Sequence, residues 1–193
     1  MSLPSILPAS SIPSILKECH RTLTSASSPG PPTSPDSADD TTSAPKSAMQ
    51  AGTLHLTILD PSPIQDTLGP RLRAWLETHL IFNLEKQFRC INPGRLFPIW
   101  LATAGLRAEG STIISVKFLA CLEEVKDSGV SRNENEVVKT QLKSMVGRML
   151  WKEIWGGFVE GDKWWWEDED VLEECEIMGT CWECSVIEAV KDG

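Results

Sequence analysis

A stretch without large apolar side chains divides this chain and limits which parts can share a core. Residues 24–51 consist almost entirely of Ser, Thr, Pro, Asp, Ala and Gly, and Met49 is their only large apolar residue. Such a composition cannot bury enough apolar area to offset the entropy of ordering the chain. We therefore expect a disordered insert over residues 24–51. It separates a lead-in and crossover helix within residues 1–23 from a folded domain over residues 52–193.

Apolar spacing and Gly or Pro punctuation predict the elements of that domain. Three strands are predicted over residues 53–59, 112–119 and 181–190. In the strand over residues 53–59, even the more polar face carries only weakly polar residues, so we expect this strand to be covered on both faces. Helices are predicted over residues 11–23, 70–84, 93–104 and 168–178, and a longer one follows a capping box at residues 131–134 and ends before Gly156.

The acidity of the chain is concentrated at one end. Residues 160–193 hold twelve Asp or Glu against two Lys, a charge of -10, whereas the whole chain carries -9. A negative field repels phosphate backbones and anionic lipids, so we expect neither nucleic-acid nor membrane binding by charge attraction. The apolar N-terminus contains prolines and lacks the basic start of a secretory signal, which favours a cytoplasmic or nuclear protein.

Several short phrases, taken in order, resemble one enzyme family. Residues 18–23 read E-x-x-R-x-L at the end of a helix, and residues 52–56 resemble a G-G-x-L-x-L strand. Residues 104–106 read A-G-L before the next strand, and residues 182–191 resemble a final strand. In this order they resemble the C-terminal half of class I, Rossmann-like methyltransferases that depend on S-adenosyl-L-methionine (SAM), in the type 11 group and a form associated with fungi.

The resemblance implies an α/β fold. It would be a partial Rossmann-like methyltransferase fold with three strands, the last one antiparallel, and helices on both faces. In the complete family, a methyl group passes from SAM to a small-molecule acceptor. The resemblance implies that this half positions the acceptor.

The part of the family that holds SAM has no counterpart in this sequence. No G-x-G-x-G loop follows a predicted strand, and no acidic residue ends a second strand to hold a ribose. The resemblance therefore implies that this chain alone binds no SAM and is inactive, as a half-domain or truncated product would be. The implied partners are the missing N-terminal half or a second copy of the chain.

Candidate substrate-lining residues follow from the position of ligands in open α/β sheets, outside the carboxyl ends of the strands. Asp60 and Ser62 follow the first predicted strand, although Asp60 is equally explained as a turn or helix cap. Arg89 and Asn92 lie between two predicted helices. An Arg there would pair with an acidic substrate group, while Asn92 also suits a helix N-cap.

Aromatic residues supply the remaining candidates. Trp151 and Trp155 lie one turn apart on the long predicted helix, and a run of three Trp follows at residues 164–166. These rings would either wall an aromatic substrate site or pack in the core. An alternative function is a non-catalytic interaction module with an acidic, Trp-rich tail, and a third possibility is an unrelated α/β domain.

Cysteine and histidine give no clear signal of a metal or catalytic centre. The spacing C-x5-C-x2-C from Cys175 to Cys184 offers three thiols, and Cys181 and Cys184 would point to opposite faces of a strand. We therefore expect no metal site. His55, within the first predicted strand, is interpreted as a core histidine rather than a general base.

Overall fold

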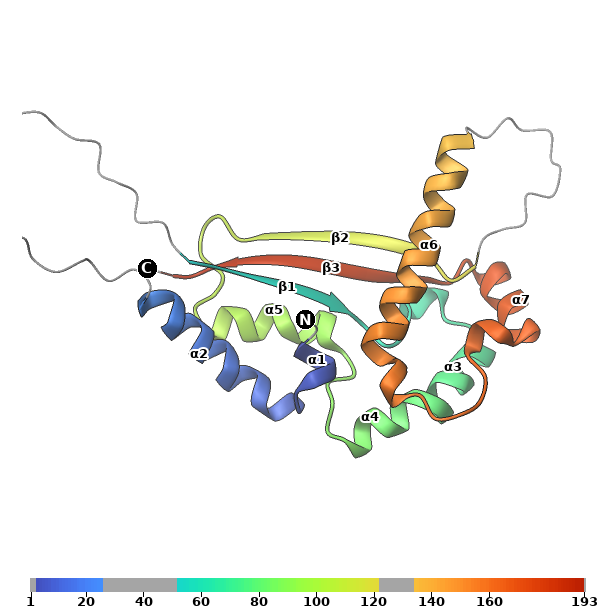
Figure 1. Ribbon diagram of the computed structural model, residues 1–193, viewed down its shortest axis with the longest axis horizontal. Coiled ribbons are helices and arrows are strands. Elements are labelled where there is room, and N and C mark those ends of the chain that lie inside the picture. Colours follow the sequence, from blue (N-terminus) through green and yellow to red (C-terminus); the bar gives the residue numbers. More distant parts are fainter. Residues whose placement is uncertain (1–2, 26–51, 122–133, 193) are drawn as a thin grey trace, which may run out of the picture.

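The computed structural model describes residues 3–25, 52–121 and 134–192 (Figure 1). Its helices and strands are α1 (Leu3–Ile6), α2 (Ile12–Ser25), β1 (Thr53–Leu59), α3 (Pro70–Leu76), α4 (Phe82–Lys86), α5 (Pro93–Thr103), β2 (Thr112–Leu119), α6 (Glu134–Trp155), α7 (Glu169–Met178) and β3 (Cys181–Val190). A π-helical segment, Glu77–Ile81, joins α3 to α4. No helix among the described residues is long and apolar enough to cross a membrane.

Most element boundaries agree with those predicted from the sequence, but α1 is not predicted, and the helix predicted over residues 70–84 is divided by the π-helical segment and ends at Lys86. All three strands have the predicted bounds, and Gly105 and Gly179 follow their helices with positive φ angles of 70° and 58°. Helix α2 continues two residues past the predicted end, to Ser25. The rest of the predicted disordered insert, residues 26–51, and the predicted capping box at residues 131–133 lie outside the described residues.

The sheet has the order β1-β3-β2, and both pairings are antiparallel. Leu56 lies opposite Ile187, and Val116 lies opposite Cys184. Strands β1 and β2 therefore run in the same direction on either side of a reversed β3. The predicted α/β class and the antiparallel last strand are confirmed.

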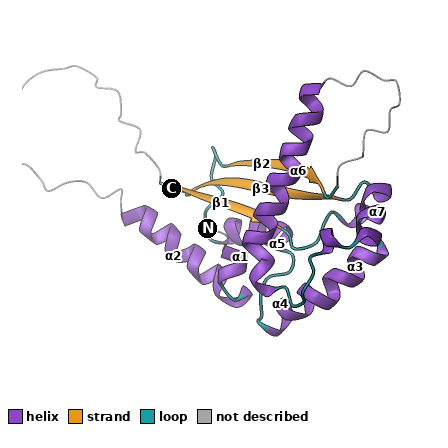
Figure 2. Ribbon diagram, turned by 45° about the vertical axis from the view of Figure 1, so that its right-hand side comes forward, coloured by secondary structure: helices purple, strands orange, loops and turns teal. Residues whose placement is uncertain are grey.

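Helices cover the two faces of the sheet at opposite ends. Successive side chains of a strand point to opposite faces. On β3, Trp182 and Cys184 are buried on one face near its start, and Ile187 and Ala189 are buried on the other face near its end. The first pair belongs to a core with α3, α4, α6 and α7, and the second to a core with α2 and α5. Figures 1 and 2 show these two groups of helices at the two ends of the strands.

The larger core is built on tryptophan. Trp182 stacks on Trp165 with ring centroids 5.2 Å apart, and Phe118 stacks on Trp182 at 6.1 Å. Trp151 meets Trp182 edge-on at 6.5 Å, and its indole Nε1 donates a hydrogen bond of 2.9 Å to the carbonyl of Pro61. Buried aromatic rings contribute large apolar areas. We call this group the tryptophan core.

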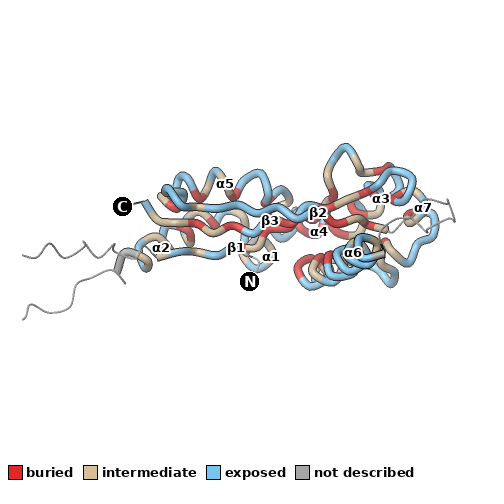
Figure 3. Tube along the Cα trace, turned by 90° about the horizontal axis from the view of Figure 1, so that it is seen from above, coloured by how far each residue is buried: buried red, intermediate tan, exposed pale blue. Residues whose placement is uncertain are grey.

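Two expectations about burial are wrong. His55 is exposed on β1, with its Nε2 3.4 Å from the Thr53 hydroxyl, because no described helix covers that face at the start of the strand. Burial along β1 is concentrated at its end, at Leu56, Ile58 and Leu59, so the strand is not covered on both faces along its whole length (Figure 3).

Helix α6 packs on the sheet at Gly147, against Phe118 of β2, and at Trp151, against Trp182 of β3. Ser144 is buried, and a side-chain atom added to Gly147 would lie 2.2 Å from the ring of Phe118. The other side of the helix is exposed, and its apolar residues share one face by their three- and four-residue spacing: Val138, Leu142, Met145, Val146 and Met149.

We expect Gly147→Ala to destabilise the protein by about 1–3 kcal/mol, because the Phe118 ring is held between the helix and Trp182 and cannot move aside. This cost outweighs the gain in helix propensity of about 1 kcal/mol. Urea denaturation measures the change. Gly157→Ala is the control, since no atom lies within 4 Å of the added carbon, and equal stability of the two variants would contradict this account of α6 packing.

Candidate functional site

The carboxyl ends of β1 and β2 lie at the end of the sheet that the tryptophan core covers, and the predicted site residues gather there. Asp60 contacts the start of α5, where its Oδ1 accepts a hydrogen bond of 2.7 Å from the backbone N–H of Gly94. Pro61 accepts a hydrogen bond from Trp151 of α6. Ser62 lies half-buried on the same turn.

Asp60 caps α5 from a distance. Asn92 occupies the position before the helix, but its side chain makes no capping hydrogen bond. The prediction that Asn92 caps this helix is therefore wrong, because the Asp60 carboxylate reaches the first turn from the end of β1. Burial raises the pKa of Asp60; the Gly94 hydrogen bond opposes this effect, and nearby Glu183 adds to it.

A second distant carboxylate holds the start of α3. Glu174 of α7 accepts hydrogen bonds of 2.9 Å from the backbone N–H groups of Arg71 and Leu72. Gly69 before the helix has no side chain to cap it. Because the first N–H groups of a helix lack partners within the helix, these carboxylates fix α3 and α5 relative to the strand ends.

Arg89 brings unpaired hydrogen-bond donors to this region. Its Nε and Nη1 atoms are buried, and no acceptor pairs with them among the described residues. The guanidinium carbon lies 5.3 Å from the ring centre of Phe158, which follows α6 and lies near Trp155. Buried cationic donors without acceptors are costly, so the side chain is suited to an anionic group that comes from outside the described residues.

The two predicted tryptophans are interior residues. Trp151 and Trp155 are both at most 1% exposed. Trp164 and Trp166 are only partly buried and stack with their centroids 5.0 Å apart. The indoles of Trp164 and Trp166 are therefore more accessible to solvent than those of Trp151 and Trp155. A substrate-lining role for Trp151 and Trp155 stays a prediction.

A cysteine pair escaped the sequence analysis. Cys121, just after β2, and Cys175 of α7 are in side-chain hydrogen-bond contact. This contact lowers the pKa of Cys121, and the nearby Arg148 guanidinium lowers it further. The same contact, together with burial, raises the pKa of Cys175. The two cysteines are far apart in sequence and match no spacing motif, so no sequence signal predicts the pair. Among the described residues, no three His, Cys, Asp or Glu side chains converge as a metal site would require.

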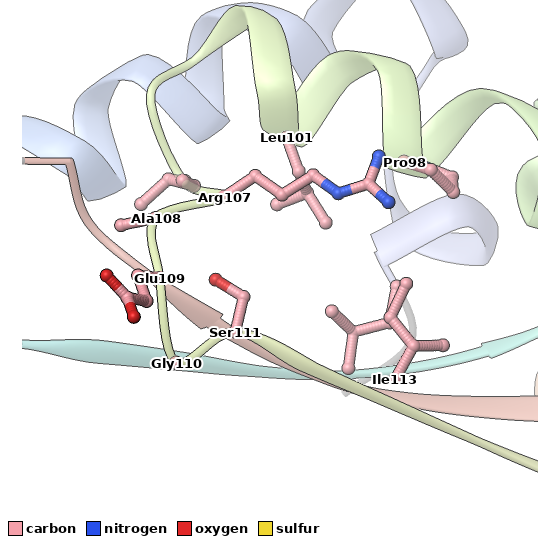
Figure 4. A pocket seen from close by; sticks show the side chains of 10 residues that line it. Pro98, Leu101, Arg107, Ala108, Glu109, Gly110, Ser111 and Ile113 are labelled. Carbon is pink, nitrogen blue, oxygen red and sulfur yellow. The ribbon is translucent and has the colours of Figure 1, made fainter.

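A separate hollow lies at the other end of β2, between the end of α5 and the loop that follows it (Figure 4). Arg107 extends across it toward Pro98, and Ile113 and Ser111 form its floor. Ser111 is already engaged, since its hydroxyl accepts a hydrogen bond from the backbone N–H of Val190. This hollow contains none of the predicted site residues.

Comparison of the chain with known protein families, with curated proteins and with solved structures gives no significant match.

We expect Asp60→Asn to be as stable as the parent protein or more stable at pH 7. The asparagine oxygen can still accept from Gly94, and no buried charge remains. The pKa of Asp60 is raised in the folded protein above its ordinary value of 3.8. Ionisation of Asp60 therefore lowers the stability of the folded protein as the pH rises from 3.8 through the raised pKa. The advantage of the amide should therefore vanish at lower pH.

Thermal unfolding at pH 7 and in acid tests this expectation. Asp60→Ala is the matched comparison, because it also removes the charge but loses the cap, and it should be about 1 kcal/mol less stable than Asp60→Asn at both pH values. A parent protein that is more stable than the asparagine variant at pH 7 would show that the ionised cap is favourable.

We expect iodoacetamide to modify Cys121 before Cys175, because the thiolate is the reactive form and Cys175 is buried. Peptide mapping by mass spectrometry after short exposures gives the order. Arg148→Met should slow the modification of Cys121, and unfolding in urea should make the two rates similar. Earlier modification of Cys175 in the folded protein would contradict the assignment.

Proposed function

We propose that this chain forms the substrate-side half of a SAM-dependent methyltransferase that acts on a small molecule, and that it is inactive without a SAM-binding half. The observation that carries the proposal is the direction of the strands. Two parallel strands, β1 and β2, flank a reversed last strand. This is the arrangement expected if β1 and β2 belong to the parallel part of a larger sheet and β3 is its antiparallel last strand.

The outer edge of β1 supports a larger sheet. Strand β1 pairs with β3 on one side and with no other described strand. Its residues from Thr53 to Leu59 include neither Pro nor Lys, which natural edge strands use to prevent pairing. The end of the strand is nevertheless buried, at Ile58 and Leu59. A fourth strand can therefore add to this edge.

The residues present do not fit SAM by themselves. In dinucleotide-binding and related folds, a Gly-rich turn after a strand lets backbone N–H groups approach the cofactor. Here Asp60-Pro61-Ser62-Pro63 follows β1, and its two prolines have fixed φ angles and no N–H. The cofactor must therefore be held by the complementary half, whether it belongs to the same polypeptide or another.

Arg89 supports an acceptor with an acidic group. Its Nε and Nη1 atoms are buried beside the Phe158 ring and have no acceptor among the described residues. A bound carboxylate or phosphate would satisfy both donors. This half would also position the acceptor relative to SAM, because correct placement of two reactants supplies much of a rate enhancement.

The alternative, an interaction module that docks through its Trp-rich tail, is less well supported. Trp165 and Trp182 are 1% exposed, and their rings form the tryptophan core instead of a surface.

We expect calorimetric titration of the isolated chain with SAM to give no heat signal. In sedimentation the isolated chain should self-associate through the outer edge of β1. Adding the complementary SAM-binding half, fused or in trans, should give a monomer that binds SAM. SAM binding by the chain alone would contradict the proposal. So would a stable monomer that shows one sharp thermal transition and no response to the added half.

A further inference from the structure

Helix α6 carries an apolar surface that no described residue covers. The first half of the helix extends beyond the sheet (Figures 1 and 2), and buried residues of α6 begin only at Ser144. The α6 stripe consists of residues that are each more than half exposed: Val138, Leu142, Met145, Val146 and Met149. Contiguous apolar patches of this kind mark interaction surfaces.

The stripe continues into a groove beside Trp166. The groove is lined by Ser144, Met145, Arg148, Met149, Lys152 and Trp166. Along one side of it, Ser144, Arg148 and Lys152 are spaced four residues apart and so form one row on the helix. Met145 and Met149 form the neighbouring apolar row, and they belong to both the groove and the α6 stripe.

The polar row is held in place and has unused hydrogen-bonding capacity. Arg148 donates from Nε to the Ala120 carbonyl at 2.7 Å and stacks over the Trp165 ring at 5.5 Å. The Lys152 ammonium lies 4.7 Å from the centre of the Trp164 ring. Ser144 is 2% exposed, and its hydroxyl makes no hydrogen bond within the described structure.

The charge of α6 is opposite to that of the chain. Residues 134–155 hold four cations (Lys139, Lys143, Arg148, Lys152) against Glu134, Glu136 and Glu153, a sum of +1, whereas residues 160–193 carry -10 and the whole chain carries -9. An acidic partner is therefore favoured on this helix over the acidic C-terminal segment. The difference in charge therefore favours an acidic partner and favours its binding on α6.

The shape of the surface selects a helix. From Val138 to Met149 the stripe is about 16 Å long, at about 1.5 Å per residue, which is three turns of a helix and longer than a small metabolite. Two cations four residues apart, Arg148 and Lys152, beside an apolar row match a partner helix with acidic residues four apart beside its own apolar stripe. Methionine adapts to irregular partner surfaces.

We propose that the α6 stripe and its groove bind the apolar, acidic face of an amphipathic helix from another protein. A second copy of this chain fits less well. Its acidic helix α7 directs Val171 and Cys175 inward and exposes large apolar residues only at its end, at Ile177 and Met178. Pairing α6 with another α6 would place the two cationic rows together. The inference does not depend on the proposed methyltransferase relationship.

The test uses the full chain and a fluorescein-labelled helical peptide of about 18 residues. The peptide has leucines three and four positions apart and glutamates four positions apart on one side. Fluorescence anisotropy should give saturable binding with a Kd of about 10 µM or tighter. A scrambled peptide of the same composition should not bind. Absence of saturation at about 100 µM would overturn the proposal.

Two variants and a control assign the site. Replacing Met145 and Met149 together by Glu should weaken binding at least about tenfold, because both side chains are exposed and their loss leaves the fold intact. Lys152→Glu should weaken binding, and a peptide with lysines in place of the glutamates should restore it. Met178→Glu on α7 is the control and should bind normally. Binding that the double variant does not change would overturn the proposal, as would a dimer in sedimentation that the double variant dissociates.

Discussion

Pairing of β3 on both of its sides is the interaction on which the rest of the structure depends. Of the three described strands, only β3 has two neighbours, and it forms near the end of the chain. Both of its pairings are long-range in sequence, so β1 and β2 have no sheet to join until the C-terminal residues are present. Loop closure must then precede most of the stabilising contacts, which favours slow, cooperative folding.

The two cores follow from this central strand. Because alternate residues of β3 face opposite sides, Trp182 and Ile187 supply the anchors of two helical layers on opposite faces. The tryptophan core is also joined to the end of β1, since Trp151 and Trp182 both donate from their indole nitrogens to the carbonyl of Pro61. The turn at the strand end is thus fixed by the same residues that fill the core, which keeps the candidate site rigid.

Two surfaces of the molecule have no partner among the described residues. The outer edge of β1 presents backbone groups without partners among the described strands, and the α6 stripe presents apolar side chains. These features require different partners, because an edge accepts a strand through backbone hydrogen bonds while a helix face accepts another apolar surface. Arg89 adds a third feature of this kind, two buried hydrogen-bond donors without an acceptor among the described residues.

The sequence by itself determined the class of fold and the bounds of nearly every helix and strand, since these depend on local apolar spacing and on Gly and Pro. It also predicted which segments of the chain lie near the carboxyl end of β1. Tertiary structure decided which groups serve which purpose there. Asp60 replaces the adjacent Asn92 as the cap of α5, and Cys121 meets Cys175, because these contacts join residues that are distant along the chain. The same holds for the apolar face of α6. Its apolar residues recur at helical spacing, and the packing of Gly147 on Phe118 and of Trp151 on Trp182 turns that face outward.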